Sequence, residues 1–317
     1  VWALVLGLLA GDFVRMCVSF FVHEYKPKAS LNSFYFRHLW QFGKFVFAQS
    51  IVLFFITQGD DAFVGKVLGT TALGLYQLAY RFSNMAATEI THVISRVTFP
   101  LYSRLQENTD ELKKSLLNAL EVISSLSLPI AGTLFILAPE FVKLFLGEKW
   151  TPIIIPMRIL CIFGAMRSIG AAFGPVYRAL AKLDIPLKIN LIHLGTMGIL
   201  IYPFSTKFYL TGTAFAITVG MMVALTLTSA KIKQLLRSSF KEIYTPVLRS
   251  MITAGVLFFI LFIWKFYFTI DNFWEFALSI GTGGFFYVIF RLAFLKKLWY
   301  INNDKTKTRE KHNENHS

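Results

Sequence analysis

The chain has 317 residues, of which 55% are hydrophobic and 16% are charged, and its mean hydropathy is +0.55. Soluble globular domains carry about 25% charged residues, so this composition excludes that class and indicates an integral membrane protein. The formal charge of +14 does not indicate nucleic-acid binding, because the Lys and Arg residues stand between apolar runs instead of forming one basic surface.

Apolar runs of membrane-spanning length follow one another along the chain. A bilayer core about 30 Å thick needs about 20 helical residues per crossing, because backbone groups cannot stay unpaired in lipid. We therefore expect an all-α, polytopic helical bundle of about nine transmembrane helices. They are predicted at residues 1–22, 39–60, 72–97, 115–137, 153–178, 186–204, 211–230, 247–267 and 274–294.

The basic residues predict the orientation of these helices. Lys and Arg gather in the segments after the first, third, fifth and seventh predicted spans and in the C-terminal tail, whereas the other connecting segments hold few. Short segments rich in Lys and Arg stay in the cytoplasm. We therefore expect the first span to run from outside to inside and the C-terminus to be cytoplasmic.

The third predicted span carries a polar stripe. Successive steps of 4, 3, 4, 3 and 4 residues place six polar side chains on one helical face, namely Gln77, Arg81, Asn84, Thr88, Thr91 and Ser95. A guanidinium at the depth of Arg81 is costly unless it faces water or a counter-charge. Two interpretations stay open: Arg81 lines a hydrated cavity, or it pairs with Asp60 or Asp61 across the helical hairpin.

Further arginines lie inside predicted spans. Arg167 and Arg178 flank a run of small residues in the fifth span, which favours close helix packing there. In the first span, Arg15 is three residues from Asp12, so it either forms a local salt bridge or contributes charge to a cavity.

Three acidic residues are candidates for ion coupling: Asp60, Asp61 and Glu89. An intramembrane carboxylate can carry a proton or a sodium ion if its surroundings change with conformation. For Glu89 the alternative is a structural ion pair with Arg96 or a neighbouring helix. Glu89 and His92 do not make a metal site, and the two cysteines, Cys17 and Cys161, predict neither a disulfide nor a thiolate site. The sequence shows no catalytic signature, so we expect no enzyme, no cofactor and no metal.

Three stretches resemble a known family. They are "WQFGKFVFAQSIVLFFITQGDDAFVGKVLGTTALGLYQLAYRFSNMAATEITHVISRVTFPLYSRLQ", "LAPEFVKLFLGEKWTPIIIPMRIL" and "FGPVYRALAKLDIPLKINL". They are similar to bacterial polysaccharide exporters of the Wzx/WzxC type, within the multidrug/oligosaccharidyl-lipid/polysaccharide flippase superfamily. The likeness covers most of residues 35–235.

The resemblance implies a fold of fourteen helices in two six-helix lobes plus a trailing pair, of which this chain would be the rear part. Residues 1–22 would be the last helix of the front lobe and 23–38 a cytoplasmic linker. Residues 39–235 would form the second lobe, 236–295 the trailing helix pair and 296–317 a disordered basic cytoplasmic tail.

The resemblance also implies a function in the bacterial inner membrane. The cargo would be an oligosaccharide on a polyprenyl diphosphate, moved between leaflets of the phospholipid bilayer by alternating access and coupled to a proton or sodium ion. Arg81, Arg167, Arg178 and Arg15 could bind the anionic groups of that cargo, and the uncharged stripe residues could bind sugar hydroxyls. Two alternatives stay open: a drug or small-molecule antiporter of the same superfamily, and a membrane glycan polymerase or ligase.

Overall fold

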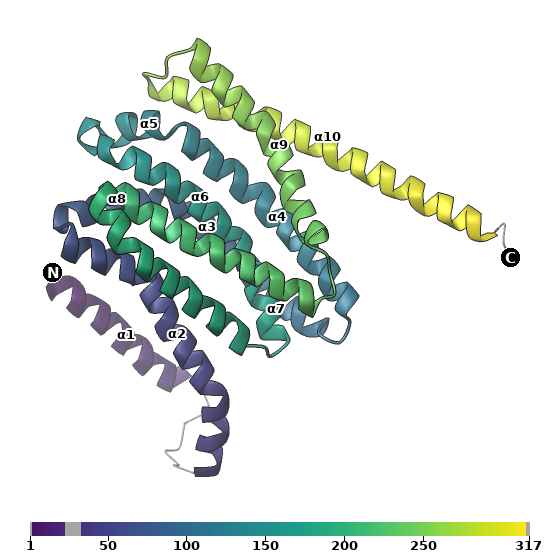
Figure 1. Cartoon of the computed structure of the whole chain (residues 1–317), viewed down its shortest axis with the longest axis horizontal. Coiled ribbons are helices and arrows are strands. Elements are labelled where there is room, and N and C mark those ends of the chain that lie inside the picture. Colours follow the sequence, from purple (N-terminus) through teal and green to yellow (C-terminus); the bar gives the residue numbers. More distant parts are fainter. Residues whose placement is uncertain (1, 23–32, 315–317) are drawn as a thin grey trace. The chain divides into compact units, whose positions relative to one another are not determined.

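The computed structural model describes residues 2–22 and 33–314, and every regular element in these ranges is a helix. The all-α prediction is therefore confirmed for the described residues. The chain divides into two compact units, Val1–Lys44 and Phe45–Ser317. Figure 1 shows the order of the helices along the chain.

The first unit holds α1 (Trp2–Val22) and the beginning of α2 (Ser33–Val67). α1 covers the first predicted span, and its large apolar side chains, such as Phe13 and Phe21, are exposed. α2 begins before the predicted start at residue 39, because the sequence from Ser33 holds no proline and no glycine until Gly43 to interrupt a helix. The helix thus begins inside the predicted linker 23–38, of which residues 23–32 lie outside the described ranges, and the linker stays a prediction.

The second unit continues α2 and contains the remaining helices. These are α3 (Thr70–Arg104), α4 (Thr109–Ile136), α5 (Ala138–Phe141), η1 (Val142–Leu146), η2 (Glu148–Ile153), α6 (Ile154–Ala171), α7 (Gly174–Ala179), α8 (Asp184–Leu235), α9 (Phe240–Tyr267) and α10 (Phe273–Glu314). Each predicted span from 72–97 onwards lies within one of these helices or within the joined segment from η2 to α7, except that 115–137 extends one residue beyond the end of α4.

α8 is two helices joined by a tight reversal. Tyr209 at its middle has φ 55° and ψ −135°, so the helix breaks there. The two halves then lie side by side: Ser205 Oγ and Thr213 Oγ1 are 2.8 Å apart, and the rings of Phe204 and Phe215 are 5.1 Å apart. The halves correspond to the predicted spans 186–204 and 211–230.

The core of the second unit is formed where α3, α6 and α8 pack together. One buried cluster includes Tyr76 of α3, Met157 and Leu160 of α6, and Ala214 of α8. A second cluster lies around Tyr102, Phe173 and Tyr177, where α3, α4, α6, α7 and α9 meet. These contacts fix the relative positions of α3 and α6, which carry most of the predicted site residues.

The trailing helices α9 and α10 pack beside α4 (Figure 1). Several polar contacts join them to α4. Among them are Ser250 with Ser124 at 2.9 Å, Tyr287 Oη donating to the Ser125 carbonyl at 2.6 Å, Arg291 with Glu121 at 3.0 Å, and Lys113 with Glu242 at 3.4 Å. The pair is therefore held against α4 by polar contacts, of which the Ser124–Ser250 bond is buried, and not by apolar contact alone.

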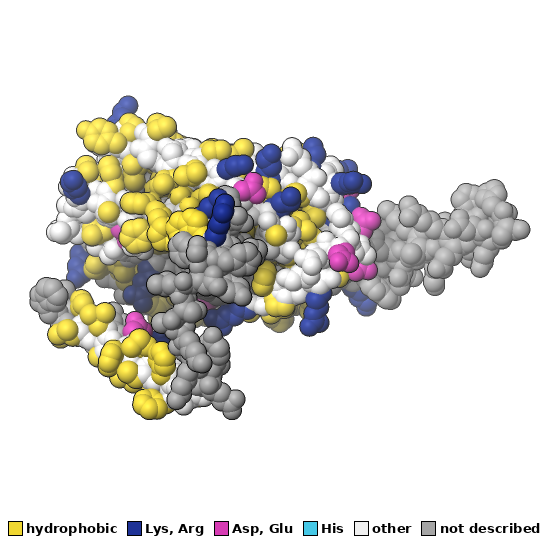
Figure 2. Space-filling view, turned by 90° about the horizontal axis from the view of Figure 1, so that it is seen from below, with side chains coloured by type: hydrophobic (Ala, Val, Ile, Leu, Met, Phe, Trp, Pro, Cys, Tyr) yellow, Lys and Arg dark blue, Asp and Glu magenta, His cyan; other side chains and the backbone are white. Residues whose placement is uncertain are grey.

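The outer surface is apolar over wide areas. Figure 2 shows hydrophobic side chains over much of one face, with Lys and Arg at several positions around it. Within the described residues, six helical segments are long and apolar enough to cross a membrane, and they begin at Val5, Thr109, Glu148, Asp184, Phe240 and Phe273. The chain is a multi-pass membrane protein, and the count of nine spans stays a prediction.

The tail differs from the sequence prediction. α10 continues to Glu314, through most of the segment 296–317 for which the sequence predicts disorder. Extending an existing helix avoids the cost of nucleation, and Lys, Arg and Glu, frequent in this segment, are good helix formers. A polar composition therefore does not end the helix by itself.

Candidate functional site

The polar stripe lies along the border between the buried and the exposed faces of α3. The side chains of Gln77 and Arg81 are exposed, Thr88 and Thr91 are half-buried, and Asn84 is only 3% exposed. The side chain of Ser95, like that of His92, is outside the described part of the chain. The stripe is thus partly open to the surroundings of the helix and partly enclosed.

Asn84 is enclosed because α3 approaches α6 closely at this level. Ser83 Oγ donates a hydrogen bond to the Met157 carbonyl at 2.9 Å, and Asn84 Nδ2 donates to the Tyr80 carbonyl at 3.2 Å. A Cβ at Gly164 would lie 3.0 Å from the Ser83 carbonyl and 3.2 Å from Asn84 Oδ1. The missing side chain of Gly164 therefore permits this contact, and Asn84 belongs to a helix interface.

Arg167 of α6 reaches back to the stripe. Its Nη1 donates to Tyr80 Oη at 3.0 Å and its Nη2 donates to Thr88 Oγ1 at 2.6 Å. Both partners are neutral, so they orient the guanidinium without neutralising it. A fixed positive charge with free donors is the arrangement that binds phosphate or carboxylate groups.

The two carboxylates at the end of α2 bond to α3. Tyr76 Oη donates to Asp60 Oδ2 at 2.7 Å, and Gln77 Nε2 donates to Asp61 Oδ2 at 2.9 Å. Asp60 is 3% exposed, and its Oδ1 has no hydrogen-bond partner among the described residues. These bonds close the α2–α3 hairpin.

Arg81 is not paired with these carboxylates. Among the described ranges of the chain, no ion pair includes Arg81, and its side chain is exposed. Of the two interpretations of Arg81, the pair with Asp60 or Asp61 is therefore not formed. The guanidinium remains available to water or to a ligand.

Tyr76 and Tyr80 are the residues that sequence reasoning missed. Their rings are 6.2 Å apart on successive turns of α3, and their hydroxyl groups bond Asp60 and Arg167 respectively. Each precedes a stripe residue, Gln77 and Arg81, by one position. A tyrosine counts as apolar in a hydropathy pattern, yet its hydroxyl needs a partner when buried, and that requirement was the available signal.

Within the second unit, Glu89 and Arg178 take no part in the hydrogen bonds of this network. Glu89 is exposed on α3. Arg178 lies on α7, with its guanidinium 5.4 Å from the centre of the Phe99 ring. In the first unit, Arg15 pairs with Asp12 at 3.5 Å, and both side chains are largely exposed. The structure therefore brings together Asp60, Asp61, Gln77, Thr88 and Arg167, with Arg81 one turn from Gln77 on the same helix.

Comparison with known proteins identifies the relatives of this chain. Residues 1–155 match a family model described as polysaccharide biosynthesis protein. The resemblance to bacterial polysaccharide exporters is confirmed. The chain is 29% identical over 188 residues to the lipopolysaccharide biosynthesis protein WzxC of Escherichia coli, which is 59% of this chain and 38% of WzxC.

One further relative and one solved structure extend the similarity over most of the chain. The teichuronic acid biosynthesis protein TuaB of Bacillus subtilis is 24% identical over 264 residues, 80% of this chain and 53% of TuaB. The chain thus spans about half or less of the length of these relatives. The solved structure of the lipid II flippase MurJ, in its inward closed conformation, matches 87% of this chain and 58% of its own with a TM-score of 0.67 and 21% identity. This similarity confirms the helical membrane-bundle fold.

Proposed function

We propose that this chain forms part of a transporter that moves a lipid-linked oligosaccharide or polysaccharide precursor across the bacterial inner membrane. The observation that supports this most is the pair of arginines on adjacent helices, Arg81 of α3 and Arg167 of α6, neither of which has a carboxylate partner among the described residues. A hydrated cleft beside them would suit a diphosphate, because charge-assisted hydrogen bonds to Arg are strong and directional.

The neutral stripe residues would serve the sugar part of such a cargo. Gln77 and Thr88 present amide and hydroxyl groups beside the two arginines. Amide and hydroxyl groups are neutral, so they can bind the hydroxyl groups of a charged or an uncharged sugar. We assign Arg81 and Arg167 to the anionic linkage, and Gln77, Thr88 and Thr91 to the glycan. Asn84 is better explained by helix packing.

The test is transport by the full-length protein in proteoliposomes that contain a polyprenyl-diphosphate oligosaccharide. We expect Arg81→Ala and Arg167→Gln each to lower the flipping rate at least tenfold, because each removes a positive charge from the binding surface. Arg158→Gln is the matched control: its Nε donates to the Phe135 carbonyl and its guanidinium stacks on the Phe135 ring. Wild-type flipping by both the Arg81→Ala and the Arg167→Gln proteins would contradict the assignment.

Coupling to a proton or a sodium ion is a further part of the proposal. Asp60 is the strongest candidate, since it is buried and one of its oxygens has no hydrogen-bond partner among the described residues, while Asp61 and Glu89 are more open. Replacing Asp60 with Asn keeps an acceptor for Tyr76 and removes the charge. We expect the Asp60→Asn protein to bind cargo and to lose the dependence of flipping on the ion gradient. An unchanged dependence would remove Asp60 from the coupling mechanism.

A further inference from the structure

A pocket of about 520 Å³ lies away from the arginine network, between the segment from Pro139 to Glu148 and the turn from α9 to α10. Small-molecule sites commonly have volumes of about 300–1,000 Å³. This α9–α10 pocket opens on the side that the distribution of Lys and Arg assigns to the outside of the membrane. Nothing in the proposed transport cycle uses it.

An ion pair between Lys265 and Glu140 lines the α9–α10 pocket, and one oxygen of its carboxylate has no hydrogen-bond partner among the described residues. Lys265 Nζ lies 2.7 Å from Glu140 Oε1 and donates to the Ile136 carbonyl at 3.4 Å. The other carboxylate oxygen, Glu140 Oε2, is buried and has no hydrogen-bond partner among the described residues. An enclosed acceptor of this kind is satisfied by a donor from a water or a ligand.

The charge of the pocket disfavours an anion. Three carboxylates line it, Glu140, Glu148 and Asp271, against the two ammonium groups of Lys143 and Lys265. Lys265 is already bound to Glu140, so Lys143 alone faces the two other carboxylates. The sum is one negative charge, which repels a phosphate and leaves many acceptors for the hydroxyl groups of a neutral ligand.

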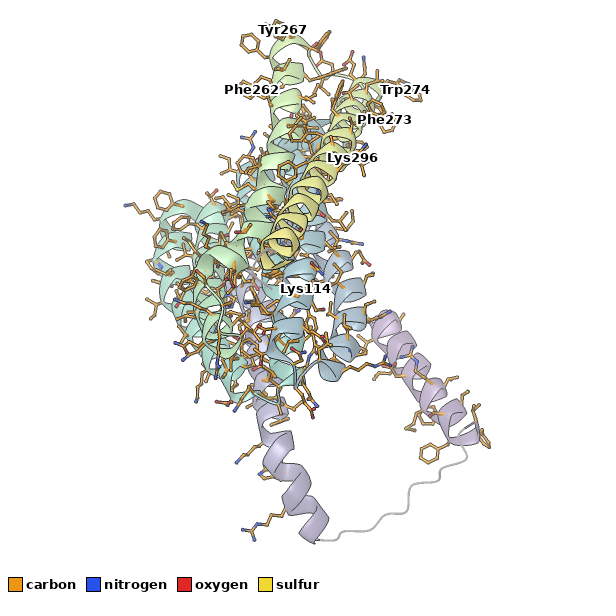
Figure 3. All side chains as sticks on the ribbon, turned by 90° about the vertical axis from the view of Figure 1, so that its right-hand side faces the viewer. Lys114, Phe262, Tyr267, Phe273, Trp274 and Lys296 are labelled. Carbon is orange, nitrogen blue, oxygen red and sulfur yellow. The ribbon has the colours of Figure 1, made fainter. Side chains whose placement is uncertain are left out.

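Aromatic rings form the open side of the pocket. Phe266, Tyr267 and Phe268 line it and are 75%, 73% and 58% exposed. Tyr267 lies at the tip of α9, and Phe273 and Trp274 lie at the start of α10, beyond the turn and outside the pocket lining (Figure 3). Exposed rings beside carboxylates match the two surfaces of a sugar, whose C–H faces stack on aromatic rings and whose hydroxyl edges donate to carboxylates.

We propose that the α9–α10 pocket binds a neutral sugar unit on the outer side of the membrane. The role of the pocket rests on the proposed function, because a glycan exporter delivers sugar to this side. There the pocket would hold part of the exported glycan after its diphosphate has left the arginines. The two sites would bind different parts of the cargo: the arginines bind the anionic linkage, and the pocket binds an uncharged sugar unit.

The test is saturation-transfer NMR on the full-length protein in lipid nanodiscs. The probes are the methyl glycosides of glucose, galactose and N-acetylglucosamine, with glucose 1-phosphate and phosphoethanolamine for comparison. We expect at least one neutral glycoside to bind at least tenfold more tightly than glucose 1-phosphate. Tyr267→Ala and Glu148→Gln should each weaken that binding at least fivefold. Phe262→Ala is the matched control, since Phe262 is 65% exposed on α9 and does not line the pocket.

Three results would overturn the proposal: no binding of any neutral glycoside, binding of phosphoethanolamine in its place, or equal effects of Tyr267→Ala and Phe262→Ala. The Arg167→Gln protein separates the two proposals. If it binds the glycoside but cannot flip cargo, both stand. If the wild type binds the glycoside but flips nothing, the proposed function fails and the pocket remains. If flipping is normal and glycosides do not bind, only the pocket fails.

Discussion

Two neighbouring side chains orient the positively charged guanidinium of Arg167 on α6. Arg167 is fixed by two hydroxyl groups, Tyr80 Oη and Thr88 Oγ1. Neutral partners limit the directions of the guanidinium and leave its charge available, whereas a carboxylate partner would cancel it. Tyr80 is therefore a positioning residue for Arg167.

Tyr80→Phe tests that role. The change removes one hydrogen bond to a charged group, which contributes about 1.5–3 kcal/mol, and it keeps the ring that packs 5.9 Å from the ring of Phe163. We expect the protein to fold normally and to flip cargo about tenfold more slowly, with a weaker affinity for the cargo. The readout is the flipping rate together with the cargo concentration at half-maximal rate.

The matched control for Tyr80→Phe is Tyr202→Phe, because Tyr202 is 62% exposed on α8 and its ring contacts Phe63 without using the hydroxyl group. Unchanged rate and affinity in the Tyr80→Phe protein would show that Thr88 and the surrounding helix orient Arg167 without help.

At the scale of elements, the reversal inside α8 depends on one missing side chain. A Cβ at Gly212 would lie 1.9 Å from the Phe204 carbonyl oxygen, which is backbone and cannot move aside alone. The first half of α8 therefore turns into the second only with glycine at this position.

We expect Gly212→Ala to abolish the folded protein in membranes or to lower its melting temperature by at least 10 °C. Gly198→Ala is the control on the same helix, since nothing lies within 4 Å of a Cβ there, and helix propensity predicts a stabilisation of about 0.5–1 kcal/mol. The comparison uses thermal unfolding of the purified proteins in detergent. Equal melting temperatures of the Gly212→Ala and Gly198→Ala proteins would show that the backbone at the reversal adjusts to a Cβ at position 212 without loss of stability.

The last helix, α10, is joined to α4 by the ion pair between Arg291 and Glu121, whose side chains are 11% and 23% exposed. Breaking a buried pair leaves an uncompensated charge, which costs about 3–5 kcal/mol, whereas removing both charges is often close to neutral. We expect Glu121→Gln to destabilise by about 3 kcal/mol, at the lower end because Glu121 is partly exposed.

A double-mutant cycle measures this tie. Addition of Arg291→Met to Glu121→Gln should recover most of the lost stability, because the second change removes the unpaired charge. The control is Lys188→Met with Asp184→Asn, an exposed pair on α8, for which we expect a coupling below about 1 kcal/mol. Additive effects of Glu121→Gln and Arg291→Met would show that the pair does not fasten α10.

For the whole molecule, helical periodicity and hydropathy predicted the fold class and the approximate position of each long helix. They also predicted the polar stripe on α3, whereas the grouping of Arg178 with Arg81 stays a prediction. Each of these properties is set within one helix, by the spacing of residues along a turn. The bend at Tyr209 also agrees with the gap between two predicted spans.

The contacts between helices could not be predicted from the sequence, because periodicity describes each helix by itself. Asn84 is buried because Gly164, on another helix, lets α6 come close, and Arg167 meets Thr88 across the same contact. Asp60 and Asp61 bond Tyr76 and Gln77 instead of Arg81, although all lie in the same hairpin. The helical tail up to Glu314 was missed because its composition is polar, while helix continuation depends on the preceding turn.

The central claim is that Arg81 faces water at membrane depth, and the reactivity of a cysteine at that position tests it most directly. A thiol reacts with a membrane-impermeant maleimide only as the thiolate, which forms in water and not in lipid. The full-length protein is studied in lipid nanodiscs, where the reagent reaches both sides, with its native cysteines, Cys17 and Cys161 among them, replaced by serine or alanine. It carries one new cysteine at a time. Arg81→Cys is the test, Lys114→Cys on α4 is the aqueous reference, and Phe259→Cys on α9 is the lipid reference, since Phe259 is 65% exposed.

We predict that Arg81→Cys reacts within about tenfold of the rate of Lys114→Cys, and that added lipid-linked oligosaccharide slows it. A rate as low as that of Phe259→Cys, with or without cargo, would contradict the account, because Arg81 would then lie against lipid or inside closed protein.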